Sequence, residues 1–184
     1  MEVFLGRQPI LDRSKNLVAF ELFFRLDETA ETATVTSNLS ATANVIVNAY
    51  GHLGIQNVLD RQRGFINVDP DLIMSDVISL LPSKHVVLEV KESIEITEKF
   101  LQRCNELKQA GYQFALDGVV TINNEVKQLL SVVSIVKVDV SVLDKNALAA
   151  LVKELKHWPV LLLAQKVETH EQAGYCMELG FQMF

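Results

Sequence analysis

The chain has 184 residues, of which 49% are apolar and 22% are charged, and its formal net charge is −6. This length and balance predict one soluble globular domain with a buried core. The negative charge argues against a nucleic-acid polymer as partner. The absence of a secretory signal or an apolar run of membrane-spanning length predicts a cytoplasmic protein that does not bind a membrane.

The first part of the chain predicts a β-hairpin. Apolar stretches over residues 4–10 and 17–24 flank a polar turn at 11–16, which is the pattern of two paired antiparallel strands. Residues 27–36 are rich in Thr, Ala and Glu and predict a loop. Over residues 37–52 apolar side chains recur at helical spacing and predict a helix, which Gly51 and Gly54 end.

After residue 60, short apolar runs alternate with helical patterns. Strands are expected over 64–68, 86–90, 113–116, 135–138 and 160–164, and helices over 71–80, 97–110, 124–130, 142–157 and 169–179. Such alternation predicts βα units on a parallel sheet, and their number favours a barrel over an open sheet. Residues 181–184 begin one more strand, so we expect a barrel that is incomplete at its C-terminal end. Apolar surface is expected at that edge, covered by dimerisation, by strand exchange or by a downstream domain.

Polar side chains stand late in the predicted strands, where α/β folds place their chemistry. They are Glu21, Asn67, Glu89, Asp117 and Lys137, with Arg25 nearby and Gln165 at the end of a further strand. Three carboxylates and an amide oxygen suit a hard divalent cation, and a lysine beside them can position a water or neutralise a phosphate. The alternative is a polar network in the barrel mouth that satisfies itself and holds no ligand.

Motifs along residues 4–184 resemble the EAL domain, the cyclic di-GMP phosphodiesterase family, and more narrowly its form that is joined to a C-terminal HDOD domain. Glu21-Leu22-Phe23-Phe24-Arg25 stands where the family has Glu-Ala-Leu-x-Arg. The other motifs follow in the family order: Gly6-Arg7-Gln8-Pro9-Ile10-Leu11-Asp12, Phe65-Ile66-Asn67-Val68, Leu88-Glu89-Val90-Lys91-Glu92, Ala115-Leu116-Asp117, Val136-Lys137-Val138-Asp139 and Ala164-Gln165-Lys166-Val167-Glu168-Thr169.

The resemblance implies a TIM-like barrel with an antiparallel first strand, one domain over residues 1–184, and an HDOD domain downstream. It also implies metal-dependent hydrolysis of cyclic di-GMP to a linear dinucleotide. In this comparison one Mg²⁺ or Mn²⁺ would be held by Glu21, Asn67, Glu89 and Asp117. Lys137 would contact the water or a phosphate, Arg25 would contact a ligand phosphate, and Glu92 and Glu168 would steady the ligand-binding loops.

Two departures from the family pattern predict little or no hydrolysis. Gly118 stands where the family has a second aspartate, so a second metal would lose a ligand. Gln165 stands where the family has the glutamate thought to act as general base, and an amide accepts no proton near neutral pH. The sequence therefore favours a catalytically degenerate, homodimeric regulatory or protein-interaction module. The alternatives are a cyclic di-GMP receptor without turnover and a weak metal-dependent phosphodiesterase.

Overall fold

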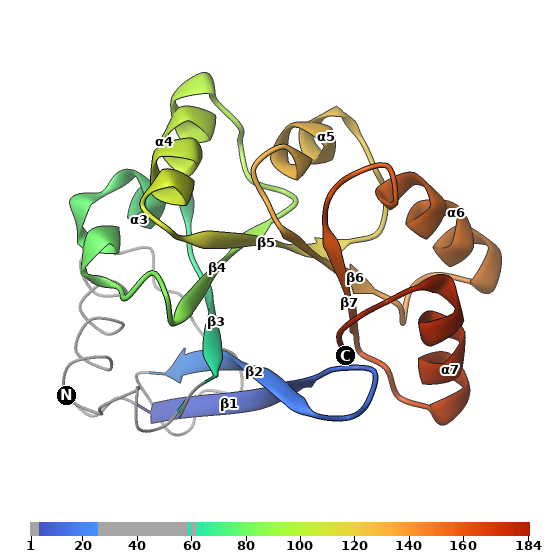
Figure 1. The fold of residues 1–184 in the computed structure, drawn as a ribbon. Helices are drawn as coiled ribbons and strands as arrows, with labels where there is room; N and C mark the ends of the chain where they lie inside the picture. Colours follow the sequence, from blue (N-terminus) through green and yellow to red (C-terminus); the bar gives the residue numbers. More distant parts are fainter. Residues whose placement is uncertain (1–3, 26–58, 60–61) are drawn as a thin grey trace.

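The computed structural model describes residues 4–25, 59 and 62–184 (Figure 1). In this part of the chain, seven strands form one sheet whose spatial order follows the sequence from β1 to β7. Strands β1 (Phe4–Leu11) and β2 (Leu17–Arg25) pair antiparallel and confirm the predicted hairpin. The loop predicted over 27–36 and the helix predicted over 37–52 lie outside the described residues.

The remaining strands pair parallel to β2 and to one another, as the βα pattern predicts. They are β3 (Arg63–Asn67), β4 (Val86–Lys91), β5 (Gln113–Val119), β6 (Ile135–Asp139) and β7 (Leu161–Gln165). The connecting helices are α3 (Pro70–Met74), the 3-10 helix η1 (Asp76–Leu80), α4 (Glu98–Gln109), α5 (Asn124–Leu130), α6 (Lys145–Leu155) and α7 (His170–Leu179). They lie on the outer side of the curved sheet (Figure 1), which confirms an incomplete TIM-like barrel with an antiparallel first strand.

The last residues of the chain lie between β7 and β1. Met183 forms a parallel bridge to Leu163 of β7 and an antiparallel bridge to Asp12. Leu11 and Phe184 exchange two backbone hydrogen bonds of 2.9 Å. The residues expected to begin one more strand therefore join the two edges of the sheet.

Most predicted bounds agree with the structure to within two residues, and three predicted elements differ by more, each for a local reason. The helix predicted over 71–80 is broken at Ser75, whose backbone is extended and whose hydroxyl donates to the Leu72 carbonyl. The helix predicted from 142 begins only after Asp144, which caps it by accepting a hydrogen bond from the Ala147 N–H. Strand β5 continues past its predicted end because Gly118 forms part of it.

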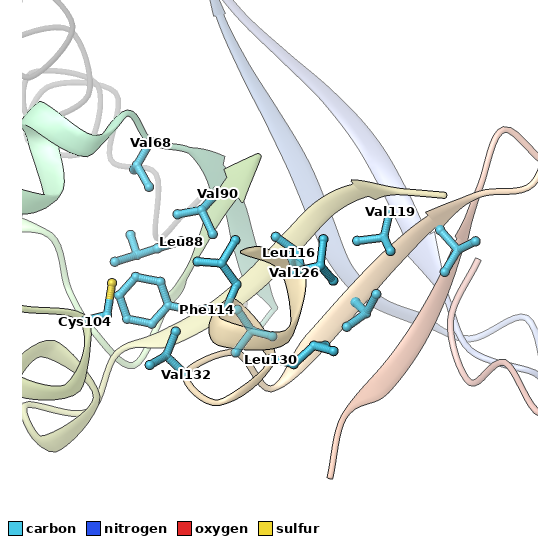
Figure 2. Close-up of a cluster of buried hydrophobic side chains, with 14 of the residues drawn as sticks. Val68, Leu88, Val90, Cys104, Phe114, Leu116, Val119, Val126, Leu130 and Val132 are labelled. Atoms are coloured by element: carbon cyan, nitrogen blue, oxygen red, sulfur yellow. The ribbon is translucent and has the colours of Figure 1, made fainter. Parts of the chain in front are cut away.

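Apolar side chains fill both faces of the sheet. On the outer face they pack between the strands and helices α4 and α5, and Figure 2 shows Leu88, Phe114 and Leu116 in one cluster with Cys104 of α4 and Val126 of α5. A second cluster fills the barrel interior with one residue from each of the seven strands: Ile10, Ala19, Phe65, Val87, Ala115, Ile135 and Leu163. The candidate site lies next to this inner cluster, in the same barrel interior.

Candidate functional site

The predicted polar residues form one layer above the inner apolar cluster. Each follows a member of that cluster by two positions on the same strand, as Glu89 follows Val87, and side chains two apart on a strand share a face. The pairs are Ala19 with Glu21, Phe65 with Asn67, Val87 with Glu89, Ala115 with Asp117, Ile135 with Lys137 and Leu163 with Gln165. Alternation along six strands therefore brings the six side chains to one end of the barrel interior.

The ammonium of Lys137 lies among three of these carboxylates. Its Nζ is 2.5 Å from Glu89 Oε1, 3.1 Å from Glu21 Oε1 and 3.1 Å from Asp117 Oδ1. The lysine side chain is fully buried, as is that of Glu89. A buried charge is tolerated when it is paired and hydrogen-bonded, and these contacts from β2, β4 and β5 meet that condition for Lys137.

Burial and the neighbouring charges shift the pKa values of Glu89 and Lys137. Burial raises the pKa of Glu89 to about 8, against the opposing effect of Lys137, and the charges of Glu21 and Asp117 raise it further. Burial alone would lower the pKa of Lys137, but Glu89, Asp117 and Glu21 together raise it above its ordinary value. The raised pKa of Lys137 keeps this ammonium charged near neutral pH.

The donor atoms fit the chemistry of one divalent cation. Glu89 Oε2 is buried and has no hydrogen-bond partner, and Asn67, half-buried, stands opposite Glu89 in the sheet register. Carboxylate and amide oxygens are the ligands that Mg²⁺, Mn²⁺ and Ca²⁺ prefer. In the described part of the chain, however, no three His, Cys, Asp or Glu side chains are arranged to hold a metal ion. The ammonium of Lys137 lies between the carboxylates, so a cation would require them to turn toward it.

Gln165 contacts the same cluster through its side-chain amide. Its Nε2 donates a hydrogen bond of 2.8 Å to Asp117 Oδ1. A carboxylate oxygen only accepts hydrogen bonds when ionised, so the NH₂ group of Gln165 faces it. Asp117 therefore has two donors on one oxygen, Lys137 and Gln165.

Gly118 lies in a left-handed backbone conformation beside Glu92. Its φ is +77°, and a Cβ atom built on it would lie 3.2 Å from Glu92 Oε2. The backbone N–H of Glu92 donates to the carbonyl oxygen of Asp117 at 3.4 Å. The structure thus places Glu92 next to the site, at the position where a family aspartate would project.

Two other predicted site residues lie apart from this cluster or cannot be placed. The side chain of Arg25, at the end of β2, lies outside the described residues. Glu168 is exposed, and its backbone N–H donates to Gln172 Oε1, which also accepts from Thr169 in the capping box of α7. The observed role of this segment is to begin α7.

Sequence reasoning missed an ion pair at the rim of the site. Asp139 Oδ2 accepts from Lys166 Nζ at 2.5 Å, and Asp139 Oδ1 accepts from the backbone N–H and the hydroxyl of Ser141. Asp139 follows Lys137 by two positions, so the same alternation would have found it. Lys166 has a φ of +57°, and no sequence signal predicts a left-handed lysine.

Comparison with known proteins gives the following matches. Residues 2–184 match the EAL domain family. The chain is 31% identical over 188 residues to an uncharacterised protein, YuxH, of Bacillus subtilis, covering all of this chain and 46% of that one. It is 29% identical over 183 residues to the cyclic di-GMP phosphodiesterase CdgJ of Vibrio cholerae, covering 98% of this chain and 42% of that one. It therefore spans less than half the length of these relatives.

A solved structure confirms the fold. The YkuI protein of Bacillus subtilis, with an EAL domain, in complex with cyclic di-GMP and calcium, superposes with a TM-score of 0.73 at 18% identity. The match covers 99% of this chain and 52% of that one. Within the described residues no helix is long and apolar enough to cross a membrane.

Proposed function

Because this chain belongs to the EAL domain family, we propose that it is a catalytically degenerate EAL domain that hydrolyses little or no cyclic di-GMP and acts as a regulatory or protein-interaction module. The observation that carries this proposal is the hydrogen bond from Gln165 Nε2 to Asp117 Oδ1. Hydrolysis needs a group that takes a proton from the attacking water. At this place the chain has an amide that already donates to a carboxylate.

The neighbouring position supports the same conclusion. Gly118 offers no ligand atom for a second cation, and two-metal phosphodiester chemistry uses one cation for the attacking oxygen and one for the leaving oxygen. General base catalysis contributes a factor of about 10²–10⁴. Together, the two positions remove the group that activates water and a ligand of a second cation.

Binding without turnover is the second candidate, and the unpartnered Glu89 Oε2 favours it. One divalent cation would be held by Glu21, Asn67, Glu89 and Asp117, and such an ion, when bound, polarises a phosphate oxygen of a ligand. Lys137, held among these carboxylates, balances part of their charge. The complex of YkuI with cyclic di-GMP and calcium gives the nucleotide to test.

In this proposal the output of the domain is a contact with another protein domain. The resemblance favours an HDOD domain of the same polypeptide as that partner, and a homodimer as the assembly. Light scattering measures the assembly, and a monodisperse monomer would contradict the dimer.

The test combines a hydrolysis assay with a titration. The purified chain is incubated with cyclic di-GMP and Mn²⁺, and the linear dinucleotide is separated by chromatography. We expect no more product than from Glu21→Ala, which lacks one proposed metal ligand. Product that Glu21→Ala abolishes would instead identify a weak phosphodiesterase.

Calorimetric titration of cyclic di-GMP in Mn²⁺ then separates the two candidates. Heat of binding, with intact nucleotide recovered afterwards, identifies a receptor. Absence of heat at high nucleotide concentration leaves the interaction module.

A further inference from the structure

We infer that Gly118 is a positioning residue: its left-handed backbone forms a bulge in β5 that turns the Asp117 carboxylate toward Lys137 and Gln165. In the same inference, Glu92 occupies the space that a side chain at position 118 would need, so this position is adapted to glycine. The inference deepens the proposed function, because it rests on Asp117 being part of the ligand site.

The register between β5 and β6 shows the bulge. Leu116 pairs with Val136, and the next pair joins Val119 to Val138. Two residues of β5, Asp117 and Gly118, therefore face the single residue Lys137 of β6. Two residues opposite one is the definition of a β-bulge, and a positive φ within it is open to glycine without the steric cost of a Cβ.

The bulge changes which face each side chain of β5 occupies. In an unbroken strand Ala115, Asp117 and Val119 would share the inner face. Here Ala115 belongs to the inner cluster, whereas Val119 is fully buried in the outer one. Figure 2 shows Val119 on the same side of the sheet as Leu116. The extra residue thus keeps Asp117 in the site while Val119 packs outside.

Contacts of Asp117 hold the inner side of the bulge. Its Oδ1 is 3.1 Å from Lys137 Nζ and accepts from Gln165 Nε2 at 2.8 Å. Its carbonyl oxygen accepts from the backbone N–H of Glu92. Both the carboxylate and the peptide group of Asp117 therefore depend on the path of the chain through Gly118.

Position 118 is also closed by Glu92. A Cβ there would lie 3.2 Å from Glu92 Oε2 and 3.8 Å from its Cδ, so the carboxylate of Glu92 would have to shift by a few tenths of an ångström. An aspartate at 118 would in addition place a second carboxylate beside that of Glu92, and like charges at this distance repel. Replacing Gly118 by aspartate alone therefore disturbs the site that it is meant to complete.

The first experiment compares Gly118→Ala with Gly111→Ala. Gly111, in the turn between α4 and the start of β5, has a φ of +96°, and a Cβ built on it would lie 3.4 Å from Ser83 Oγ. Alanine at this position therefore meets a similar backbone strain at the other end of the strand. The readouts are the melting temperature and the side-chain amide NMR signals of Gln165, assigned by their loss in Gln165→Glu.

Both variants are expected to melt several degrees below the parent, and only Gly118→Ala is expected to shift the Gln165 signals. Unchanged Gln165 signals in a destabilised Gly118→Ala would overturn the positioning role. If that variant does not fold, Gly118→Asn takes its place, because asparagine tolerates the left-handed region better than alanine.

The second experiment compares Gly118→Asp with the isosteric Gly118→Asn. Each substitution is made in two backgrounds, one that keeps Glu92 and one that carries Glu92→Gln. At neutral pH the aspartate variant is expected to melt below the asparagine variant beside Glu92, and this difference is expected to disappear beside Gln. An equal difference in both backgrounds would overturn the role of Glu92. Neither experiment contains nucleotide or metal, so failure of the proposed function and failure of this inference are separate outcomes.

Discussion

Gln165 and Asp117, which are 48 positions apart in the sequence, are joined by a side-chain hydrogen bond of 2.8 Å. The bond links the tips of β7 and β5 and presents an N–H donor to a carboxylate that Lys137 also contacts. An amide at this position donates a hydrogen bond to Asp117 without adding a charge. A glutamate would compete with Asp117 for the same lysine and the same proton.

Replacing Gln165 by glutamate is expected to destabilise the domain in the absence of metal. The change removes a donor to Asp117 and adds a like charge, and the loss of a partner for a partly buried acceptor costs about 1–3 kcal/mol. Urea unfolding near neutral pH measures it. Mn²⁺ is expected to stabilise this variant more than the parent, because a cation compensates the added carboxylate.

The control for this change is Gln128→Glu, on the exposed face of α5. It adds the same charge away from the site and is expected to leave both the stability and the response to Mn²⁺ unchanged. Equal effects of the two variants would show that the bond between Gln165 and Asp117 contributes nothing specific to the site.

The polar layer could be predicted from the sequence because period-two alternation fixes the face of each side chain. Glu89 follows Val87 and Lys137 follows Ile135, so both polar groups stand on the inner face once the runs are recognised as strands. The family resemblance added the roles of these residues, and the fold neighbours confirm the barrel.

Most of what the sequence left out depends on contacts between distant segments. The position of Lys137 among the carboxylates, in place of an open metal site, follows from distances between four strands. The bulge at Gly118 is visible only in the register between β5 and β6. The break at Ser75 follows from a local side-chain bond that competes with helix hydrogen bonding, which propensity alone does not predict.

The ion pair between Asp139 and Lys166 predicts a dependence of stability on acid pH. Burial opposes ionisation of Asp139, but bonds from Lys166 and Ser141 lower its pKa below the ordinary value of 3.8. A carboxyl whose pKa is lower in the folded state contributes stability that is present above its unfolded pKa and is lost as pH falls through the folded pKa.

Asp139→Asn is therefore expected to destabilise the domain at pH 6 and to have a smaller effect below pH 3.8. Urea unfolding of parent and variant at several pH values measures the difference. The control is Asp71→Asn, which removes an exposed carboxylate in α3, away from Lys166 and Ser141. A constant cost of Asp139→Asn across the range would contradict the assignment.

The left-handed backbone of Lys166 predicts that a change to glycine at this position does not destabilise the domain. A non-glycine residue at positive φ costs about 1–2 kcal/mol relative to glycine, and its side chain is 64% exposed, so solvent screens its pair with Asp139. Lys166→Gly is expected to melt at or above the parent temperature, because relief of the backbone offsets the lost pair.

Lys166→Ala separates the two effects, since it removes the pair and keeps the strained backbone. It is expected to melt below both the parent and Lys166→Gly in the same calorimetric scan. A glycine variant that melts as low as the alanine variant would show that the ion pair, rather than the backbone, controls this position.

Lys137→Met is expected to cause the largest loss of stability among these variants. It leaves Glu21, Glu89 and Asp117 together without their shared cation, and breaking a buried pair by removing one partner costs about 3–5 kcal/mol. Part of the loss is expected to return as pH falls, because protonation removes the repulsion between the carboxylates. Mn²⁺ is expected to raise the melting temperature of this variant more than that of the parent, because the ion can take the place of the ammonium.

Lys145→Met, which removes the exposed pair with Glu171, is the matched control and is expected to change little. If Mn²⁺ stabilises Lys137→Met no more than it stabilises Lys145→Met, the carboxylate cluster is a structural network and not a cation site.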